Sequence, residues 1–173
     1  MEEIYITKER LELLKKSKAL SGKLSRTCGC TITFSDDSVV LNGAPYNEYI
    51  AKTVIFAFGR GFGADDALKL VNDDYYFTSI DLEREVGGGK RLMMIKARII
   101  GEGGRTKVYI EGVSSAKISV YGNTVSIIGT IEQINEAETA INTLIEGGTH
   151  RLAYLRMEAA HRKHKSGATN PVF

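Results

Sequence analysis

The residues best suited to chemistry form one short glycine-rich stretch, which runs Arg98-Ile-Ile-Gly101-Glu-Gly-Gly104-Arg-Thr-Lys107. Glycine has no Cβ atom, so its backbone turns sharply and lets another chain approach closely. We expect a helix on each side of the glycines, and the free N–H groups and positive dipole end of a helix N-terminus attract phosphate. Together with the nearby cations, the stretch predicts a loop that grips a sugar-phosphate backbone.

Other glycine-dependent sites fail on spacing. A nucleotide P-loop needs Gly-Lys followed by Ser or Thr, but Leu24 follows Gly22-Lys23 and Arg91 follows Gly89-Lys90. A dinucleotide fingerprint that began at Gly101 would need a sixth-position glycine where Thr106 stands, and a strand before it. No cofactor is therefore expected.

Catalytic and metal-binding sets are also not apparent. Cys28 and Cys30 are too close in sequence for an ordinary disulfide and lack further ligands, so we expect them to be buried as small apolar side chains. His161 and His164 lie three apart on a predicted helix with no acid or cysteine beside them, and no metal is expected there. Without a nucleophile paired with a base, the chain is predicted not to be an enzyme.

Composition and charge are those of a folded, water-soluble chain. The 173 residues are 43% hydrophobic and 25% charged, and no apolar run reaches the ~18 residues that a bilayer requires. The start, MEEIYITKER, is acidic where a signal peptide is basic, so we expect a cytoplasmic protein that is not in a membrane. Residues 1–89 hold 11 Lys+Arg against 14 Asp+Glu and residues 90–173 hold 12 against 7, so the second half favours a polyanion.

The chain also contains a weak internal repeat with an offset of 86 residues. Residues 28–61 align without gaps on residues 114–147, with few identities but matched apolar positions. In each copy two alternating strands joined by a polar turn precede an amphipathic helix, over 45–58 and 131–145. Helical stretches over 8–27 and 90–113 and apolar strands at 4–6 and 75–82 come before them. Each unit is thus strand, helix, helix, strand, strand, helix.

This order and the glycine loop resemble a type I KH domain, whose Gly-x-x-Gly loop clamps about four single-stranded nucleotides. Motifs across the chain resemble the archaeal two-KH proteins that are counterparts of the eukaryotic pre-rRNA processing factor partner of Nob one. They are Gly-Phe at 61–62, Ala67-Leu68, Asp73-Asp74-Tyr75-Tyr76, Ile80-Asp81-Leu82, Arg98-Ile-Ile-Gly101, Ile118-Ser-Val-Tyr-Gly122, Thr124-Val125, Ile127-Ile-Gly129 and Gly147-Gly-x-His150.

The predicted fold is therefore α+β, with two tandem type I KH domains, each a three-stranded sheet with helices on one face. Domain 1 would span residues 1–62, and a linker with a short helix would follow over residues 63–74. Domain 2 would span residues 75–148, and a basic helix and tail would occupy residues 149–173. The first copy places Lys15, Lys16, Ser17 and Lys18 where the second has Gly101–Gly104, so it has lost the glycine loop. The tail from Ser166 to Phe173 is expected to fray.

The resemblance implies binding to the 3′ region of small-subunit rRNA, alongside the endonuclease that cuts there and the alpha subunit of translation initiation factor two. The RNA-binding set predicted on the second copy is Arg98, Ile99, Ile100, Gly101, Glu102, Gly103, Gly104, Arg105, Lys107, Val108, Ile118, Val120 and Tyr121. Its aliphatic members could belong to the groove or to the core, and Tyr121 could stack on a base or be a half-buried strand aromatic.

Two features depart from the family pattern, because Glu102 repels a phosphate and Lys107 stands where an aliphatic residue is common. A secondary surface for RNA or protein is predicted at Lys15, Lys16, Lys18, Lys23, Arg26, Arg151 and Arg156. The leading function is a non-catalytic factor for ribosome assembly that binds single-stranded RNA. The alternative is a protein-interaction scaffold that uses KH folds for partner docking.

Overall fold

The computed structural model describes residues 1–167, and these divide into two compact units, Met1–Phe77 and a second that begins at Thr78. Most of the tail expected to fray lies outside the described residues; Ser166 and Gly167 close the last helix. No helix within residues 1–167 is both long enough and apolar enough to cross a bilayer.

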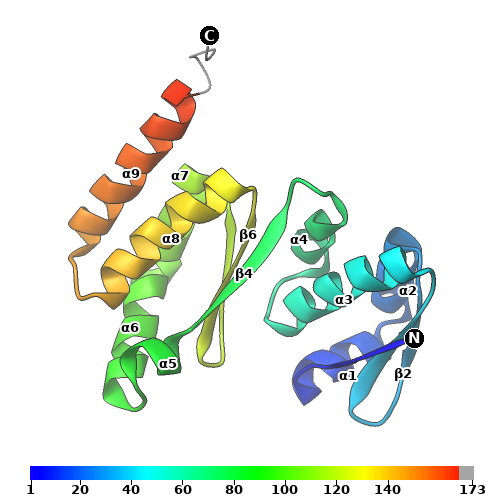
Figure 1. The fold of residues 1–173 in the computed structure, drawn as a ribbon. Coiled ribbons are helices and arrows are strands. Elements are labelled where there is room, and N and C mark those ends of the chain that lie inside the picture. The colour runs from blue at the N-terminus through cyan, green and yellow to red at the C-terminus, as the bar shows by residue number, and fades with distance from the viewer. Residues whose placement is uncertain (168–173) are drawn as a thin grey trace. The chain divides into compact units, whose positions relative to one another are not determined.

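The first unit begins with the predicted order of elements (Figure 1). These are β1 (Glu2–Tyr5), α1 (Lys8–Lys16), α2 (Lys18–Cys28), β2 (Thr31–Phe34), β3 (Ser38–Asn42) and α3 (Pro45–Gly59), followed by α4 (Ala64–Ala67) and the 3-10 helix η1 (Leu68–Val71). The antiparallel sheet has the order β1-β3-β2, and its register pairs Ile4 with Val39 and Ile32 with Leu41.

Alternation along β3 buries Val39 and Leu41 against the helices. Pro45 begins α3, as its fixed φ favours. Cys28 and Cys30 are buried, which confirms their predicted place in the interior. Burial, with Cys30 beside it, raises the pKa of the Cys28 thiol to about 11, so this thiol stays protonated at neutral pH.

The second unit repeats this order with three additions. Its elements are β4 (Tyr76–Asp81, which begins at the boundary), α5 (Leu82–Val86), α6 (Lys90–Ile100), the 3-10 turn η2 (Glu102–Gly104), α7 (Arg105–Ser114), β5 (Lys117–Tyr121), β6 (Thr124–Gly129), α8 (Ile131–Ile145) and α9 (His150–Gly167). The sheet order is β4-β6-β5, with β5 antiparallel to β6. The short α5 was not predicted; the Asp81 carboxylate caps it by accepting the Arg84 N–H at 3.1 Å.

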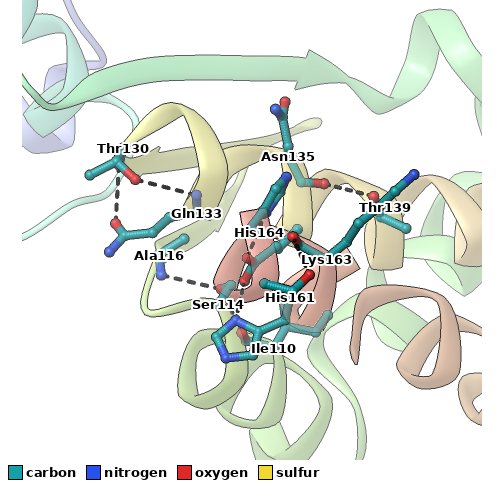
Figure 2. A network of polar contacts seen from close by, with 12 residues as sticks. Ile110, Ser114, Ala116, Thr130, Gln133, Asn135, Thr139, His161, Lys163 and His164 are labelled. Carbon is teal, nitrogen blue, oxygen red and sulfur yellow. Dashed lines mark hydrogen bonds and ion pairs between the residues drawn. The ribbon is translucent and has the colours of Figure 1, made fainter. Parts of the chain in front are cut away.

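One core joins this sheet to its helices. It contains Leu82, Ile95, Ile99, Ile110, Ile118, Val125, Ile127, Ile141, Leu144 and Met157, among others. The predicted capping box at the start of α8 is present, because Thr130 and Gln133 exchange side-chain and backbone hydrogen bonds (Figure 2). Ser126 and Ile128, on the other face of the central strand, are buried as well. Strand β6 is therefore buried on both faces, although one solvent-exposed face was expected for this sheet.

Helix α9 packs against α8 and α7 (Figure 1). Glu136 of α8 is 3% exposed, and its two carboxylate oxygens lie 2.8 Å from His161 Nδ1 and 2.9 Å from His164 Nδ1 (Figure 2). The expectation that no acid joins these histidines was wrong, because the acid comes from another helix. The pair therefore satisfies a buried carboxylate and fixes α9.

We expect His161→Ala to lower the free energy of unfolding by about 1–2 kcal/mol, because a buried Glu136 oxygen loses its partner. The neighbouring Arg162 is exposed, and Arg162→Ala should change stability by no more than about 0.5 kcal/mol. Urea denaturation of both variants measures the difference. Equal effects would show that the contact does not stabilise α9.

Candidate nucleic-acid interface

The glycine loop between α6 and α7 is built from three residues with positive φ, of which Gly103 and Gly104 are left-handed and Gly101 has an extended ψ of 169°. Helix α6 ends at Ile100, and Gly101, Gly103 and Gly104 have φ values of 77°, 60° and 80°. The Gly101 N–H closes α6 by donating to Ala97 O at 2.8 Å, and the Gly104 N–H donates back to Gly101 O at 3.1 Å. Only glycine adopts such a series of conformations without strain.

Two of these glycines leave the loop open and the third is enclosed. A Cβ atom at Gly101 would lie 2.7 Å from the backbone nitrogen of Thr106, so no side chain fits there. Cβ atoms at Gly103 and Gly104 would meet no heavy atom within 4 Å in the described chain. The outer surface of the loop is therefore bare backbone that a ligand can approach.

This bare surface lies at the N-terminus of α7. Gly104 precedes the helix and has no side chain to cap it. The first N–H groups of any α-helix lack partners within the helix; here the first of them, on Arg105, donates to Glu102 O of the preceding 3-10 turn. The dipole adds positive potential at the same end. Arg105 is exposed there, while Lys107 Nζ lies 3.5 Å from Glu111 of its own helix. Glu102 is exposed on the loop and opposes an anion.

The structure sorts the predicted RNA-binding residues into three groups. Exposed ones are Glu102, Gly103, Arg105 and Val108; half-buried ones are Ile100, Gly101, Gly104, Lys107, Val120 and Tyr121. Ile99 and Ile118 are 0% and 3% exposed, so of the two places left open for the aliphatic members of the set, these two side chains occupy the core and not the groove. The spacing of apolar residues along the chain shows that a position is apolar, but it does not show whether the side chain packs in the core or lines the groove.

Arg98 has a different partner from the one expected. Its guanidinium donates to the carbonyl oxygens of Leu144, at 3.0 Å, and Gly148. These carbonyls lie at the C-terminal end of α8, where cations are favoured. We therefore assign Arg98 to fastening α6 to α8.

Sequence reasoning missed the outer face of α6. Met93 and Met94 are 72% and 54% exposed, and Ala97 is exposed as well. Met93, Ala97 and Ile100 lie at helical spacing and lead toward Gly101. Counting back from the glycines by three and four would have found this apolar strip, which offers contact area beside the loop.

The C-terminal helix α9 contacts the residue that packs against the glycine loop. The Tyr154 hydroxyl of α9 donates to Thr106 Oγ1 at 3.3 Å, and Thr106 is the residue that encloses Gly101. Tyr109 of α7 stacks at a tilt on Tyr154, with ring centroids 4.3 Å apart, and donates to Glu158. This hydrogen bond raises the pKa of Tyr109, which keeps its hydroxyl a donor. Helix α9 is thus part of the structure that positions the loop.

The corresponding place in the first unit has no glycine loop. Ser17 separates α1 from α2, and its hydroxyl caps α2 by accepting the Leu20 N–H at 3.2 Å. The side chain occupies a position that an anion takes at an uncapped helix.

The cations predicted as a secondary surface mostly have partners. In the first unit, Lys15 donates to the Asp36 carbonyl at 3.0 Å, Lys16 lies 3.9 Å from Glu12, and Lys23 pairs with Asp65. Lys18 and Arg26 are exposed. On α9, Arg151 is exposed, and Arg156 lies 4.0 Å from Glu146.

Comparison with known proteins finds the domain type that the order of elements and the glycine loop predict. A family model described as a eukaryotic type KH domain (KH-domain type I) matches residues 76–162. The KH domain-containing protein MJ0443 of Methanocaldococcus jannaschii is 33% identical over 172 residues, which are 95% of this chain and 76% of that protein. The pre-rRNA-processing protein PNO1 of Chaetomium thermophilum is 34% identical over 116 residues, and the match covers 45% of its length.

Solved structures agree over nearly the whole chain. Dim2p from Pyrococcus horikoshii has a TM-score of 0.83 at 32% identity and covers 91% of this chain and 98% of that one. Dim2p in a complex with a/eIF2alpha and rRNA has a TM-score of 0.85 at 31% identity, with 94% of each chain covered.

The element order, the glycine loop and the family match define the second unit as a type I KH domain. The chain belongs to the PNO1 family of KH-domain proteins, as an archaeal counterpart of eukaryotic PNO1. The family match runs to residue 162 and includes most of α9, which the sequence had placed outside the domain.

We expect Gly101→Ala to lower the free energy of unfolding by about 2–3 kcal/mol, since it combines a positive φ with a clash against Thr106. Gly103→Ala meets no atom and should cost only about 1 kcal/mol, for its left-handed backbone alone. Chemical denaturation of the two variants measures the difference. Equal losses would mean that the loop relaxes around Gly101.

Proposed function

We propose that this chain is a non-catalytic RNA-binding factor whose second unit holds single-stranded RNA by its backbone. The observation that carries the proposal is the open loop of Gly101–Gly104 at the N-terminus of α7, which no side chain caps. Backbone N–H groups and the helix dipole offer an anion a site that does not depend on base identity. Met93, Ala97 and Val108 offer apolar contact to the bases beside it.

We propose that the RNA is the 3′ region of small-subunit ribosomal RNA and that binding serves maturation of its end in the cytoplasm. Support comes from relatives named as pre-rRNA-processing proteins and from a similar structure in a complex with rRNA. The same complex supports a/eIF2alpha as a protein partner. The endonuclease that makes the cut is a further proposed partner, which rests on the family resemblance.

For the first unit, we propose a degenerate KH domain devoted to protein contact. It has the β-α-α-β-β-α order, but Ser17 caps the helix where the second unit presents its loop. Hydrogen bonds and ion pairs hold Lys15, Lys16 and Lys23. A backbone clamp for RNA is therefore expected in the second unit alone.

Fluorescence anisotropy with a single-stranded oligoribonucleotide of the small-subunit rRNA 3′ end tests the proposal. We expect binding to the single strand, weaker binding to the same sequence in a duplex, and loss of binding in Gly104→Asp, which puts a carboxylate at the anion site. If the intact chain does not bind the single strand, the protein-scaffold function becomes the better explanation.

Replacing Glu102 should strengthen the same interaction. Glu102→Lys removes a repulsion and adds a cation, so we expect severalfold tighter binding and a salt dependence steeper by about 0.7 in log K against log salt. Glu146→Lys makes the same change of net charge at the end of α8 and is the control. Equal gains in the two variants would indicate a general charge effect without contact at the loop.

A further inference from the structure

Exposed aromatic side chains gather in the first unit. Tyr5, Tyr46, Tyr49, Phe56 and Tyr76 have exposed fractions between 38% and 68%. Within residues 78–167 of the second unit, the one comparable side chain is Tyr109, which hydrogen-bonds to Glu158. Large exposed aromatics that cluster on one surface favour a binding site.

Two of these aromatics, Tyr49 and Tyr76, line a pocket of about 320 Å³ together with Tyr75 and Phe77. One wall is a face of α3 that carries Tyr49, Ile50 and Thr53, and the other is the segment from Asn72 to Phe77. A turn shapes that segment, because the Asp74 N–H donates to Asn72 Oδ1 and the Tyr75 N–H donates to Asn72 O, each at 3.0 Å. A helix therefore forms one wall of the pocket, and a hydrogen-bonded turn shapes the other.

The charge of this pocket is negative. Among its lining residues in the described chain, Asp73 is the one that carries a charge. The Tyr46 hydroxyl donates to Asp73 Oδ1 at 3.0 Å, and this hydrogen bond raises the pKa of Tyr46. Tyr46 thus remains a neutral donor that orients the carboxylate, whose second oxygen can accept from a ligand.

A second pocket of about 520 Å³ adjoins the first. The two share Tyr49, Thr53 and Phe77 as lining residues, and the second pocket also contains Ile4, Tyr5 and Phe56. Its walls are mainly apolar, although Glu3 and Lys52 line it as well, and Lys52 pairs with Glu2 at 2.9 Å. The site as a whole suits a cationic group next to an apolar one.

We propose that the tyrosine pocket around Asp73 binds an arginine side chain from an extended segment of a protein partner, with an apolar side chain of that segment in the adjoining pocket. A guanidinium stacks on aromatic rings and pairs with a carboxylate in a directed way, which suits tyrosines beside Asp73. In an extended peptide, residues two apart point to the same side and can enter adjacent pockets. A nucleotide fits less well, because its phosphate would meet Asp73, Asp74 and Glu3.

The test uses the full chain and a fluorescein-labelled tetrapeptide with leucine and arginine two positions apart. A second peptide replaces arginine by citrulline, which has the same shape without the charge. We expect the arginine peptide to bind about tenfold more tightly than the citrulline peptide. Asp73→Asn keeps an oxygen for Tyr46 and should remove that preference, whereas Asp74→Asn, beside the pocket but not in its lining, should keep it.

Thermal melting and RNA binding of both variants show whether they remain folded. The proposal is overturned if neither peptide binds the wild-type chain, if arginine and citrulline bind equally, or if Asp73→Asn and Asp74→Asn lose affinity to the same extent. It is also overturned if a uridine oligonucleotide displaces the peptide and binds more tightly to Asp73→Asn, since the occupant would then be a nucleotide.

Discussion

The proposed RNA site depends on a turn of the backbone that side chains would prevent. Gly101, Gly103 and Gly104 all have positive φ, and the space beside Gly101 is filled by Thr106. Because the turn is this tight, only four residues separate the end of α6 at Ile100 from the start of α7 at Arg105, and no side chain caps α7. Much of the second unit supports this arrangement: Arg98 fastens α6 to α8, and Tyr154 of α9 contacts Thr106. The function proposed for the chain follows from backbone geometry more than from the number of its cations.

The two units show how the same order of elements can differ in chemistry. Both contain β-α-α-β-β-α, and both place two helices in succession before the hairpin. In the first, Ser17 has an extended backbone and its own hydroxyl satisfies α2; in the second, glycines leave the helix end open. One unit exposes bare backbone suited to a polyanion, and the other exposes tyrosines around a carboxylate. The proposed roles, RNA binding by the second unit and protein binding by the first, account for this difference.

Sequence patterns predicted most elements, because strands with period two and helices with capping signals are local properties. The helix from Pro45, the box at Thr130 and the break at Gly101–Gly104 are of this kind. Patterns could not separate core from groove, so both places stayed open for Ile99 and Ile118, whose burial assigns them to the core. Nor could they show that Arg98 reaches Leu144 or that Glu136 meets His161, since each pair comes from different elements. Long-range polar contacts depend on packing, which spacing along the chain does not reveal.

The most direct measurement of the central claim follows the backbone amide signals of the chain by NMR while a single-stranded rRNA 3′ oligonucleotide is added. If the loop holds the sugar-phosphate backbone, the largest shifts occur at the amides of Gly103 to Lys107, with smaller ones along the α6 face at Met93 and Ala97. If these amides stay in place while shifts appear in the first unit or on α9 alone, RNA binds elsewhere and the account is wrong.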